Sequence, residues 1–547
     1  MRLNLPCITA FVALLCSSVA GFGQRFRFAR ELQLAAEFGL DADKLLEDRQ
    51  EFRTIEEYDR IPAEYISLPI DHDDPSVGTF QNRFWANDEY YKPGGPVIVY
   101  DAGETNAGSS ANHLTSEYSF FPGILEEFGA IGVVWEHRYY GNSLPYPVAN
   151  DTPPEHFKYL TTKQALADIP VFAENFTRPR LQQFDLTPVS TPWVMLGGSY
   201  AGSRVAFARN MYPDTIFASF ASSAPVQAQV NMSVYYEQVY RAMVANGWTN
   251  CAKDIHSALE YIDEQLSQED TAASIKKLFL GDGAEQNSNE DFTAALSIIY
   301  EFFQSRGFDE SSGSLGEFCQ WLELDHETGE SSGPDGFAPS LGKQHVVELW
   351  ATWPQFVNLV NIFMETNCQM PDIPDATCTL NARVTDPDSI AWSWQYCSEW
   401  GFYQSNNVGA HSLLSRYQTP EFQQVMCNRQ FPEALERGLL PSEPQADAVN
   451  EEFGGWSIRP SNVYWTAGEF DPWRTLSPLS NEESSPQVNV TSEIPQCGVQ
   501  TAANTVFGYI GDNEYHCFDF NAASSLGETS RGYFRQALKE WLPCFGK

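Results

Sequence analysis

Basic residues are scarce in this chain. Lys and Arg together number 33 against 72 Asp and Glu, giving a formal net charge of −39 over 547 residues. A surface so rich in carboxylates repels nucleic acid and anionic membranes, and we expect neither as a partner. The acidic excess suits an acid milieu, in which many carboxylates are protonated and the self-repulsion of the surface falls.

Apolar runs long enough to cross a bilayer are missing, so we expect no membrane anchor. Metal-binding patterns are also missing, because the sequence has neither a Cys-x-x-Cys pair nor a His-x-x-x-His cluster. We therefore predict neither a metal ion nor a cofactor. The oligomeric state is open, a homodimer included.

The first 20 residues have the pattern of a secretory signal peptide. Met1 and Arg2 precede an apolar stretch at 3–15 and a run of small residues that ends at Ala20. We expect a secreted protein, with the vacuolar or lysosomal lumen as the alternative. Cleavage there leaves nine cysteines, which predicts four disulfides and one unpaired thiol of undetermined connectivity in an oxidising compartment. Four sequons predict glycosylation at Asn150, Asn175, Asn231 and Asn489.

Strand and helix signals divide the remaining chain into three parts. Residues 21–229 hold an N-terminal extension and then short apolar runs, among them 94–104, 130–141 and 217–225, which alternate with helical segments such as 162–175. This alternation predicts an α/β protein with a mostly parallel sheet and helices on both faces. Residues 230–454 have helical periodicity, at 234–246, 255–266, 292–303 and 346–363, and are predicted to form a helical cap. Strand character returns in 455–547, at 461–471 and 505–510, before a final helix at 530–541.

A tight strand-to-helix turn lies at residues 197–202, which read Gly-Gly-Ser-Tyr-Ala-Gly. The pattern is typical of a nucleophile elbow, which exposes a serine hydroxyl at the tip of a sharp turn. Ser199 is the predicted nucleophile, and a glycine-rich packing turn is the alternative. The backbone N–H of Tyr200 opens the following helix and is a predicted oxyanion donor, with Gly103 in the loop after an earlier strand as the second.

A serine needs an imidazole to accept its proton and a carboxylate to orient that imidazole. In α/β-hydrolases these groups follow the serine in the order acid, then histidine, after later strands. Asp471 and His516 occupy those places, and His516 is the last histidine of the chain. Asp512 and Asp519 are weaker candidates for the acid. We expect a structural hydrogen-bonding role for the earlier His137.

Together these segments resemble the family of lysosomal prolyl carboxypeptidase and dipeptidyl-peptidase II, which also includes fungal acid prolyl endopeptidases. The resemblance rests on residues 136–145 (Glu-His-Arg-Tyr-Tyr-Gly-Asn-Ser-Leu-Pro), 159–168, the elbow, 471–473 (Asp-Pro-Trp) and 516–519 (His-Cys-Phe-Asp). It implies an α/β-hydrolase core and the catalytic residues Ser199, Asp471 and His516. It also implies a cap that closes over a pocket for proline and carries a disulfide between Cys397 and Cys427.

The resemblance further implies a serine peptidase that cuts peptides or proteins after proline through an acyl-enzyme, in mild acid. A proline ring is compact and apolar, so an aromatic slot is expected to select it. Trp473 is the first candidate wall; Trp400 and Phe402 are further candidates, with ordinary cap packing as their alternative. An insertion at 481–503 leaves carboxypeptidase, dipeptidyl-peptidase and endopeptidase modes open. The rival functions are a lipase or esterase and a non-catalytic binding protein on the same fold.

Overall fold

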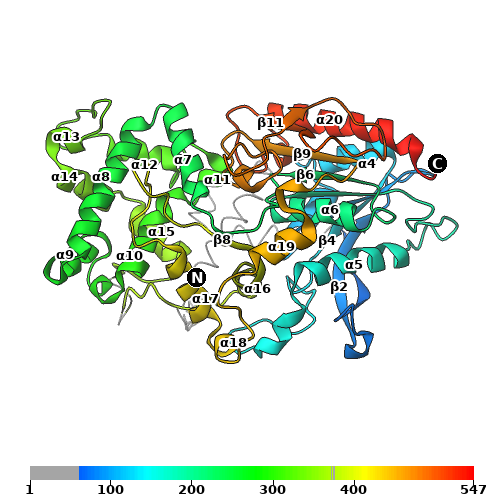
Figure 1. Cartoon of the computed structure of the whole chain (residues 1–547), viewed down its shortest axis with the longest axis horizontal. Coiled ribbons are helices and arrows are strands. Elements are labelled where there is room, and N and C mark those ends of the chain that lie inside the picture. Colours follow the sequence, from blue (N-terminus) through cyan, green and yellow to red (C-terminus); the bar gives the residue numbers. More distant parts are fainter. Residues whose placement is uncertain (1–60, 371–372, 374–375) are drawn as a thin grey trace, which may run out of the picture.

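A nine-stranded sheet forms the centre of the protein in the computed structural model, which describes residues 61–370, 373 and 376–547. The strands lie in the order β1-β2-β4-β3-β5-β6-β9-β11-β10 (Figure 1). The pairs β1–β2 and β2–β4 are antiparallel, and every other pair is parallel. The strands are β1 (Glu64–Pro69), β2 (Thr79–Asn87), β3 (Val97–Asp101), β4 (Ile131–Trp135), β5 (Trp193–Gly198), β6 (Ala218–Ser222), β9 (Val463–Gly468), β10 (Asn489–Thr491) and β11 (Thr505–Gly511).

Helices cover both faces of this sheet because its central strands are apolar on both sides. Side chains of α5 (Thr162–Asn175) and α6 (Tyr200–Met211) pack in one buried cluster with Val97 and Val99 of β3. Side chains of α4 (Phe121–Phe128) and α20 (Ser525–Trp541) pack in a second cluster with Ile98. Alternate residues of β3 thus face opposite layers, as in any strand buried on both sides. This is the α/β-hydrolase fold, and the sheet with these four helices is called the core below.

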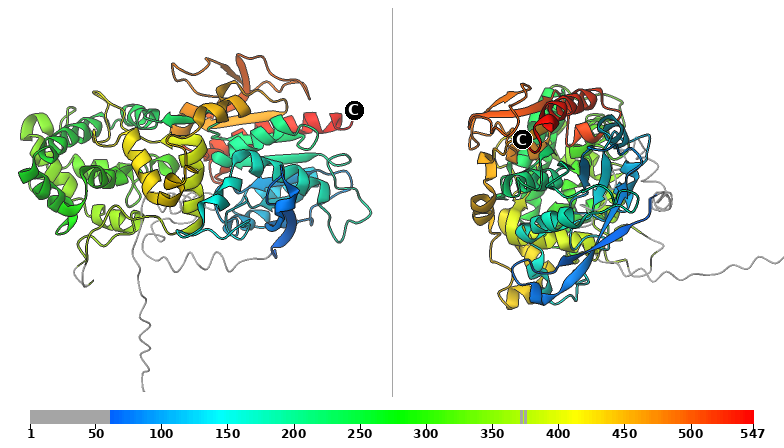
Figure 2. Two further views of the ribbon diagram at one scale, coloured as in Figure 1. Left: turned by 60° about the horizontal axis from the view of Figure 1, so that its bottom comes forward. Right: turned by 90° about the vertical axis from the view of Figure 1, so that its right-hand side faces the viewer.

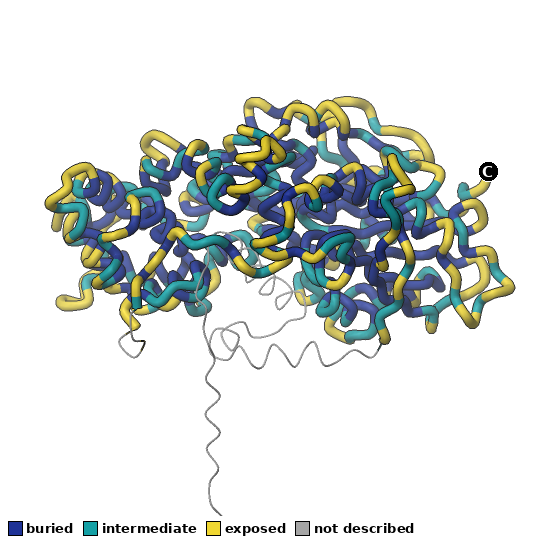
Figure 3. The backbone as a smooth tube through the Cα atoms, turned by 90° about the horizontal axis from the view of Figure 1, so that it is seen from below, coloured by how far each residue is buried: buried dark blue, intermediate teal, exposed yellow. Residues whose placement is uncertain are grey.

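The region between β6 and β9 is mostly helical and is called the cap. Its helices gather at the end of the molecule away from the sheet, with α16–α19 between the two (Figures 1 and 2). Figure 3 shows buried backbone running through both regions, each beneath an exposed rim. The cap helices are α7 (Val234–Ala245), α8 (Thr249–Leu266), α9 (Glu269–Leu280), α10 (Asn289–Leu296), α11 (Phe303–Arg306), α12 (Leu315–Leu322), α13 (Ala338–Leu341), α14 (Lys343–Ala351), α15 (Phe356–Phe363), α16 (Pro387–Gln395), α17 (Pro420–Gln430), α18 (Pro432–Glu436) and α19 (Ala446–Phe453).

Two predicted cap helices are broken in the structure. The segment 346–363 divides into α14 and α15 because Pro354 lacks a backbone N–H and its ring clashes with the preceding turn. The segment 292–303 divides into α10, a short 3-10 turn and α11. Two short strands at the start and in the later part of the cap also pair in parallel, β7 (Gln229–Asn231) with β8 (Gly401–Tyr403).

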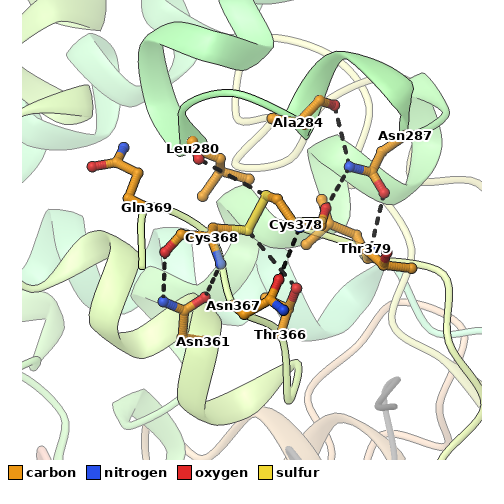
Figure 4. Close-up of a disulfide and its surroundings, with 12 residues drawn as sticks. Leu280, Ala284, Asn287, Asn361, Thr366, Asn367, Cys368, Gln369, Cys378 and Thr379 are labelled. Carbon is orange, nitrogen blue, oxygen red and sulfur yellow. Dashed lines mark hydrogen bonds between the residues drawn. A yellow bond between two sulfur atoms is a disulfide. The ribbon is translucent and has the colours of Figure 1, made fainter. Parts of the chain in front are cut away.

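Four disulfides and one free thiol account for the nine cysteines among the described residues. The pairs are Cys251–Cys319, Cys368–Cys378, Cys397–Cys427 and Cys497–Cys544, and Cys517 is free and buried. The number of disulfides and the pairing of Cys397 with Cys427 match the predictions. Figure 4 shows how the Cys368–Cys378 bridge is held: Asn361 bonds both backbone polar groups of Cys368, and Asn287 donates to the carbonyl of Cys378.

The predicted signal peptide and most of the N-terminal extension lie outside the described residues. Across the described part of the chain, every helix is too short or too polar to span a bilayer. Over the same residues, no group of three His, Cys, Asp or Glu side chains is arranged to hold a metal ion.

Candidate active site

The turn between β5 and α6 places Ser199 at its tip. Ser199 has φ 59° and ψ −132°, a conformation that costs a non-glycine residue energy and is found at functional turns. The glycines on either side of Ser199 are required because a side chain would collide with the backbone there. A Cβ added to Gly197 would lie 2.5 Å from the carbonyl oxygen of Ala201, and one added to Gly202 would lie 2.6 Å from a backbone oxygen of β6. The sequence therefore folds here into the sharp turn that was predicted.

Asp471 and His516 lie together at the same edge of the sheet, after β9 and β11. His516 Nδ1 and Asp471 Oδ1 are 2.9 Å apart, and both side chains are buried. Asp471 Oδ1 also accepts the backbone N–H of Trp473 at 2.9 Å, which fixes the carboxylate. The other ring nitrogen, His516 Nε2, has no hydrogen-bond partner among the described residues. That atom is the one a proton acceptor in such a pair must keep available.

The end of β6 contacts both the elbow and the loop at residues 512–517, which carries His516 and is called the histidine loop below. The N–H of Ser199 donates to the carbonyl of Ser222 at 2.9 Å. The next residue, Ser223, accepts the N–H of Cys517 on its hydroxyl at 2.8 Å, and its own N–H donates to a carbonyl of β9 at 2.7 Å. In addition, a Cβ added to Gly198 would meet the Cys517 sulfur at 2.8 Å. The elbow, the loop that carries His516 and the strand β9 that precedes Asp471 therefore meet at two consecutive serines.

The weaker candidates have other roles. Asp519 is buried and accepts from the hydroxyls of Ser222 and Ser530, so it braces β6 and α20. Asp512 is exposed. His137 is fully buried, with Nδ1 against the carbonyl of Arg138 at 2.6 Å and Nε2 3.3 Å from the Tyr200 hydroxyl. It makes structural hydrogen bonds, as predicted, beneath the elbow.

The charge state of His516 depends on two opposed effects. Burial lowers the pKa of the imidazole because it penalises the charged form, whereas the Asp471 carboxylate and Cys517 raise it. The raising effects are the larger, and the pKa of His516 lies well above its usual value. His516 in the free protein is therefore protonated in mild acid.

Of the two predicted oxyanion donors, one is in place. Tyr200 is the first residue of α6, where a backbone N–H has no partner within the helix. The N–H of Gly103 is instead engaged, because the Asp101 carboxylate folds back and accepts it at 2.9 Å. The prediction for Gly103 as a donor is thus wrong for this structure. Gly103 still borders the elbow, since a Cβ added there would lie 3.2 Å from Ala201 Cβ.

Trp473, Phe402 and Trp400 form one line of aromatic contacts beside the pair of Asp471 and His516. The ring of Trp473 lies 6.4 Å from that of His516 and 5.2 Å from Phe402, measured between centroids. Trp473 is half-buried and Phe402 is nearly buried. Trp400 has no exposed surface and stacks on Phe402 and Phe207, so it supports this wall from behind instead of lining it.

Two site residues were missed in the sequence. Ser223 directly follows β6 and has φ 49°. The sequence signal that could have marked it is a buried strand that ends in two polar residues. Gln304, in the short helix α11, bonds the backbone of His516 and the side chain of Trp473. No sequence pattern marks Gln304, because its partners lie about 170 and 210 positions away.

The sequons differ in accessibility. Asn175, Asn231 and Asn489 are exposed. Asn150 is half-buried, and its side-chain amide donates to Val384 and accepts from Gln430. A glycan on Asn150 would have to displace the first of these bonds.

Comparisons with known proteins find relatives among serine peptidases. The family model described as serine carboxypeptidase S28 matches residues 69–496, well over half of the chain. A "Probable extracellular serine carboxypeptidase" of Arthroderma benhamiae is 28% identical over 442 residues, covering 76% of this chain but only 59% of the relative. "Serine protease vicPb" of Bipolaris victoriae is 26% identical over 78% of this chain and 80% of the relative. The mouse "Thymus-specific serine protease" is 27% identical over 85% of this chain and 84% of the relative.

Proposed function

Because the chain belongs to the serine carboxypeptidase S28 family, we propose that it is a serine peptidase whose nucleophile is Ser199, with His516 as the base and Asp471 as the orienting acid. The observation that carries this assignment is the 2.9 Å bond between His516 Nδ1 and Asp471 Oδ1, which leaves the buried Nε2 without a partner. The loop that carries His516 touches the strained serine turn, since a Cβ on Gly198 would meet the Cys517 sulfur at 2.8 Å. No other His–carboxylate pair in the described chain adjoins the elbow.

The proposed reaction has two halves. His516 Nε2 takes the proton of the Ser199 hydroxyl as the oxygen attacks the substrate carbonyl, and the N–H of Tyr200 stabilises the oxyanion. The imidazolium then gives this proton to the leaving amine as the C–N bond breaks, which leaves an acyl-enzyme. Water, deprotonated by His516, attacks the ester and releases the acid. Asp471 keeps Nδ1 protonated throughout.

We propose that the substrates are peptides or proteins cut on the carboxyl side of proline. The support is the aromatic wall of Trp473 and Phe402 beside His516, which suits a compact apolar ring. Replacing Trp473 with Ala should lower kcat/KM on proline substrates more than on alanine substrates. Mass spectrometry of a digested peptide library measures this preference, and the distance of each cut from the termini distinguishes exopeptidase from endopeptidase action. Equal cutting after proline and alanine in the wild type would exclude the specificity.

The working pH depends on His516. The acidic surface favours residence in mild acid, but a base acts only when neutral, and the pKa of His516 is raised. We propose that the fold tolerates acid while kcat/KM climbs as the pH rises through the pKa of His516. A profile of kcat/KM against pH tests this, and a maximum near pH 5 would contradict it and favour the acid optimum expected from composition.

The decisive test of the nucleophile is Ser199→Ala. Loss of the serine in such a triad lowers kcat by on the order of a millionfold, while a hydroxyl at a turn tip contributes little to packing. A fluorophosphonate should label the wild type at Ser199 and leave the variant unlabelled, with the thermal midpoint unchanged. Label on Ser203 or Ser223 would refute the assignment.

We also propose secretion, with glycans on the exposed sequons Asn175, Asn231 and Asn489. The support is the N-terminal leader pattern, the four disulfides and the extracellular A. benhamiae relative. Glycosidase treatment followed by peptide mapping identifies the modified residues.

A further inference from the structure

A single cap residue contacts two parts of the catalytic region. The backbone carbonyl of Gln304 accepts the N–H of His516 at 2.8 Å. Its side-chain Oε1 accepts the indole N–H of Trp473 at 3.0 Å and the hydroxyl of Tyr235 at 3.2 Å. An indole nitrogen can only donate, so the amide oxygen of Gln304 must face it.

The segment around Gln304 is pressed against the histidine loop. The rings of Phe303 and Tyr515 meet edge to face with centroids 5.5 Å apart. Gly307 has φ 60°, and a Cβ there would lie 2.0 Å from Cζ of Tyr515, so only glycine fits. The backbone of Gln304 is thus held by contacts on both sides, and its side chain projects from a fixed base.

Trp473 has few other restraints on its ring. Its indole meets Phe402, Tyr235 and His516 through ring contacts at 5.2, 5.9 and 6.4 Å, which restrain it less directionally than a hydrogen bond. The bond to Gln304 is the directional contact that sets how the indole plane is turned.

We infer that Gln304 is a positioning residue that sets the orientation of Trp473 and so the preference for proline. This inference rests on the proposed function, in which Trp473 walls the proline slot. Gln304 acts through Trp473 and needs no contact with substrate. Because the main-chain bond to His516 does not depend on the side chain, substitutions at this position separate specificity from proton transfer.

The test compares kcat/KM on matched chromogenic peptides with proline or alanine before the scissile bond. Gln304→Met keeps the length and approximate volume of the side chain and removes the acceptor oxygen. We expect the proline-to-alanine ratio to fall about tenfold, the effect of losing one directional bond. The loss should appear in KM for proline peptides more than in kcat, and kcat/KM for alanine peptides should fall less than that for proline peptides. Gln304→Glu still offers an acceptor oxygen and should keep most of the wild-type proline-to-alanine ratio.

Gln320→Ala is the matched control, because Gln320 is an exposed cap glutamine away from the site. Should the methionine variant fail to fold, Gln304→Asn replaces it, since the shorter amide cannot reach both donors. An unchanged ratio in these variants, or a glutamate variant as impaired as methionine, would overturn the inference. Failure of the proposed function appears separately, as a wild type that does not prefer proline.

Discussion

The core and the cap bury their acidic groups in different ways. In the core, two buried carboxylates face cations: Arg138 pairs with Asp168 and Arg204 with Asp101. In the cap, Asp388 accepts backbone N–H groups of Asn106 and Gly141, and Glu399 accepts the N–H and hydroxyl of Thr162. Burial, aided by Asp386, raises the pKa of Asp388 to about 7, and burial raises that of Glu399 to about 7. These two core carboxylates are therefore neutralised by cations, whereas Asp388 and Glu399, which join the cap to the core, take up protons near pH 7.

The two regions also differ in covalent support. Three of the four disulfides join parts of the cap, and the fourth ties the C-terminal end of the chain. The core relies instead on a continuous sheet with two apolar layers. We therefore expect changes in the core to affect the proposed active site most, and changes to the cap cross-links and to its buried acids to affect stability most.

The largest expected effect is in the core. Asp471→Asn should lower kcat by about 10⁴-fold, because the amide favours the wrong imidazole tautomer while keeping the shape of the side chain. Denaturation midpoints should differ little from the wild type at neutral pH. Steady-state kinetics measures the effect, and a loss below tenfold would show that the core pair is not catalytic.

Breaking a cap cross-link should affect stability and leave chemistry in place. Replacing Cys397 and Cys427 together with Ala removes a bridge of sequence separation 30, worth about 3.6 kcal/mol in the chain-entropy model. The Cys368–Cys378 pair, with separation 10, is the matched comparison and should cost about 2.7 kcal/mol. Urea unfolding measures both free energies. A free thiol at any of these four cysteines in the wild type would show that the disulfide concerned does not form.

Ser223→Gly sharpens the comparison because it changes the geometry of the core. Glycine accepts the positive φ of this position, but the N–H of Cys517 loses its acceptor. A displaced histidine loop should lower kcat about 10²-fold. Ser219→Ala, a buried serine on the same sheet strand, is the control and should retain activity. Equal activity in both variants would mean that the β6 junction does not align the site.

The smallest expected effect is the pH response of the cap. The folded pKa of Asp388 is about 7 against an ordinary 3.8, so the folded state gains a proton that the unfolded state lacks as the pH falls. From pH 7 to pH 5 the free energy of unfolding should therefore rise by about 2 kcal/mol from this group. Asp388→Asn should reduce this change in the free energy of unfolding with pH, and Glu399→Gln should have the same effect. A slope unchanged in both variants would assign the pH response to general surface charge.

The sequence predicted features that are local or follow strand order. The elbow could be identified because Gly197 and Gly202 are needed within five residues of each other. Asp471 was preferred over Asp512 and Asp519 because it ends a strand, and the 2.9 Å bond to His516 bears out that choice of partner.

Other features depend on contacts between distant segments. The N–H of Gly103 is occupied because Asp101 folds back onto it, a side-chain conformation that strand patterns do not reveal. The bonds of Gln304 and Ser223 form only once the cap and the histidine loop are packed. Trp400 and Trp473 are both tryptophans near the site in the sequence-based prediction. Only their burial in the structure shows that Trp400 is covered and Trp473 is partly exposed.

The pairing of β6 with β9 has a consequence for biosynthesis. Ser219 lies opposite Val463 in the register, so the ribosome must make the whole cap before the sheet can close. Until then the edge of β6 has unpaired backbone groups that can join another strand, and the long loop slows its correct pairing. We therefore expect chains truncated within the cap to aggregate, because their exposed strand edge and apolar surface have no partner.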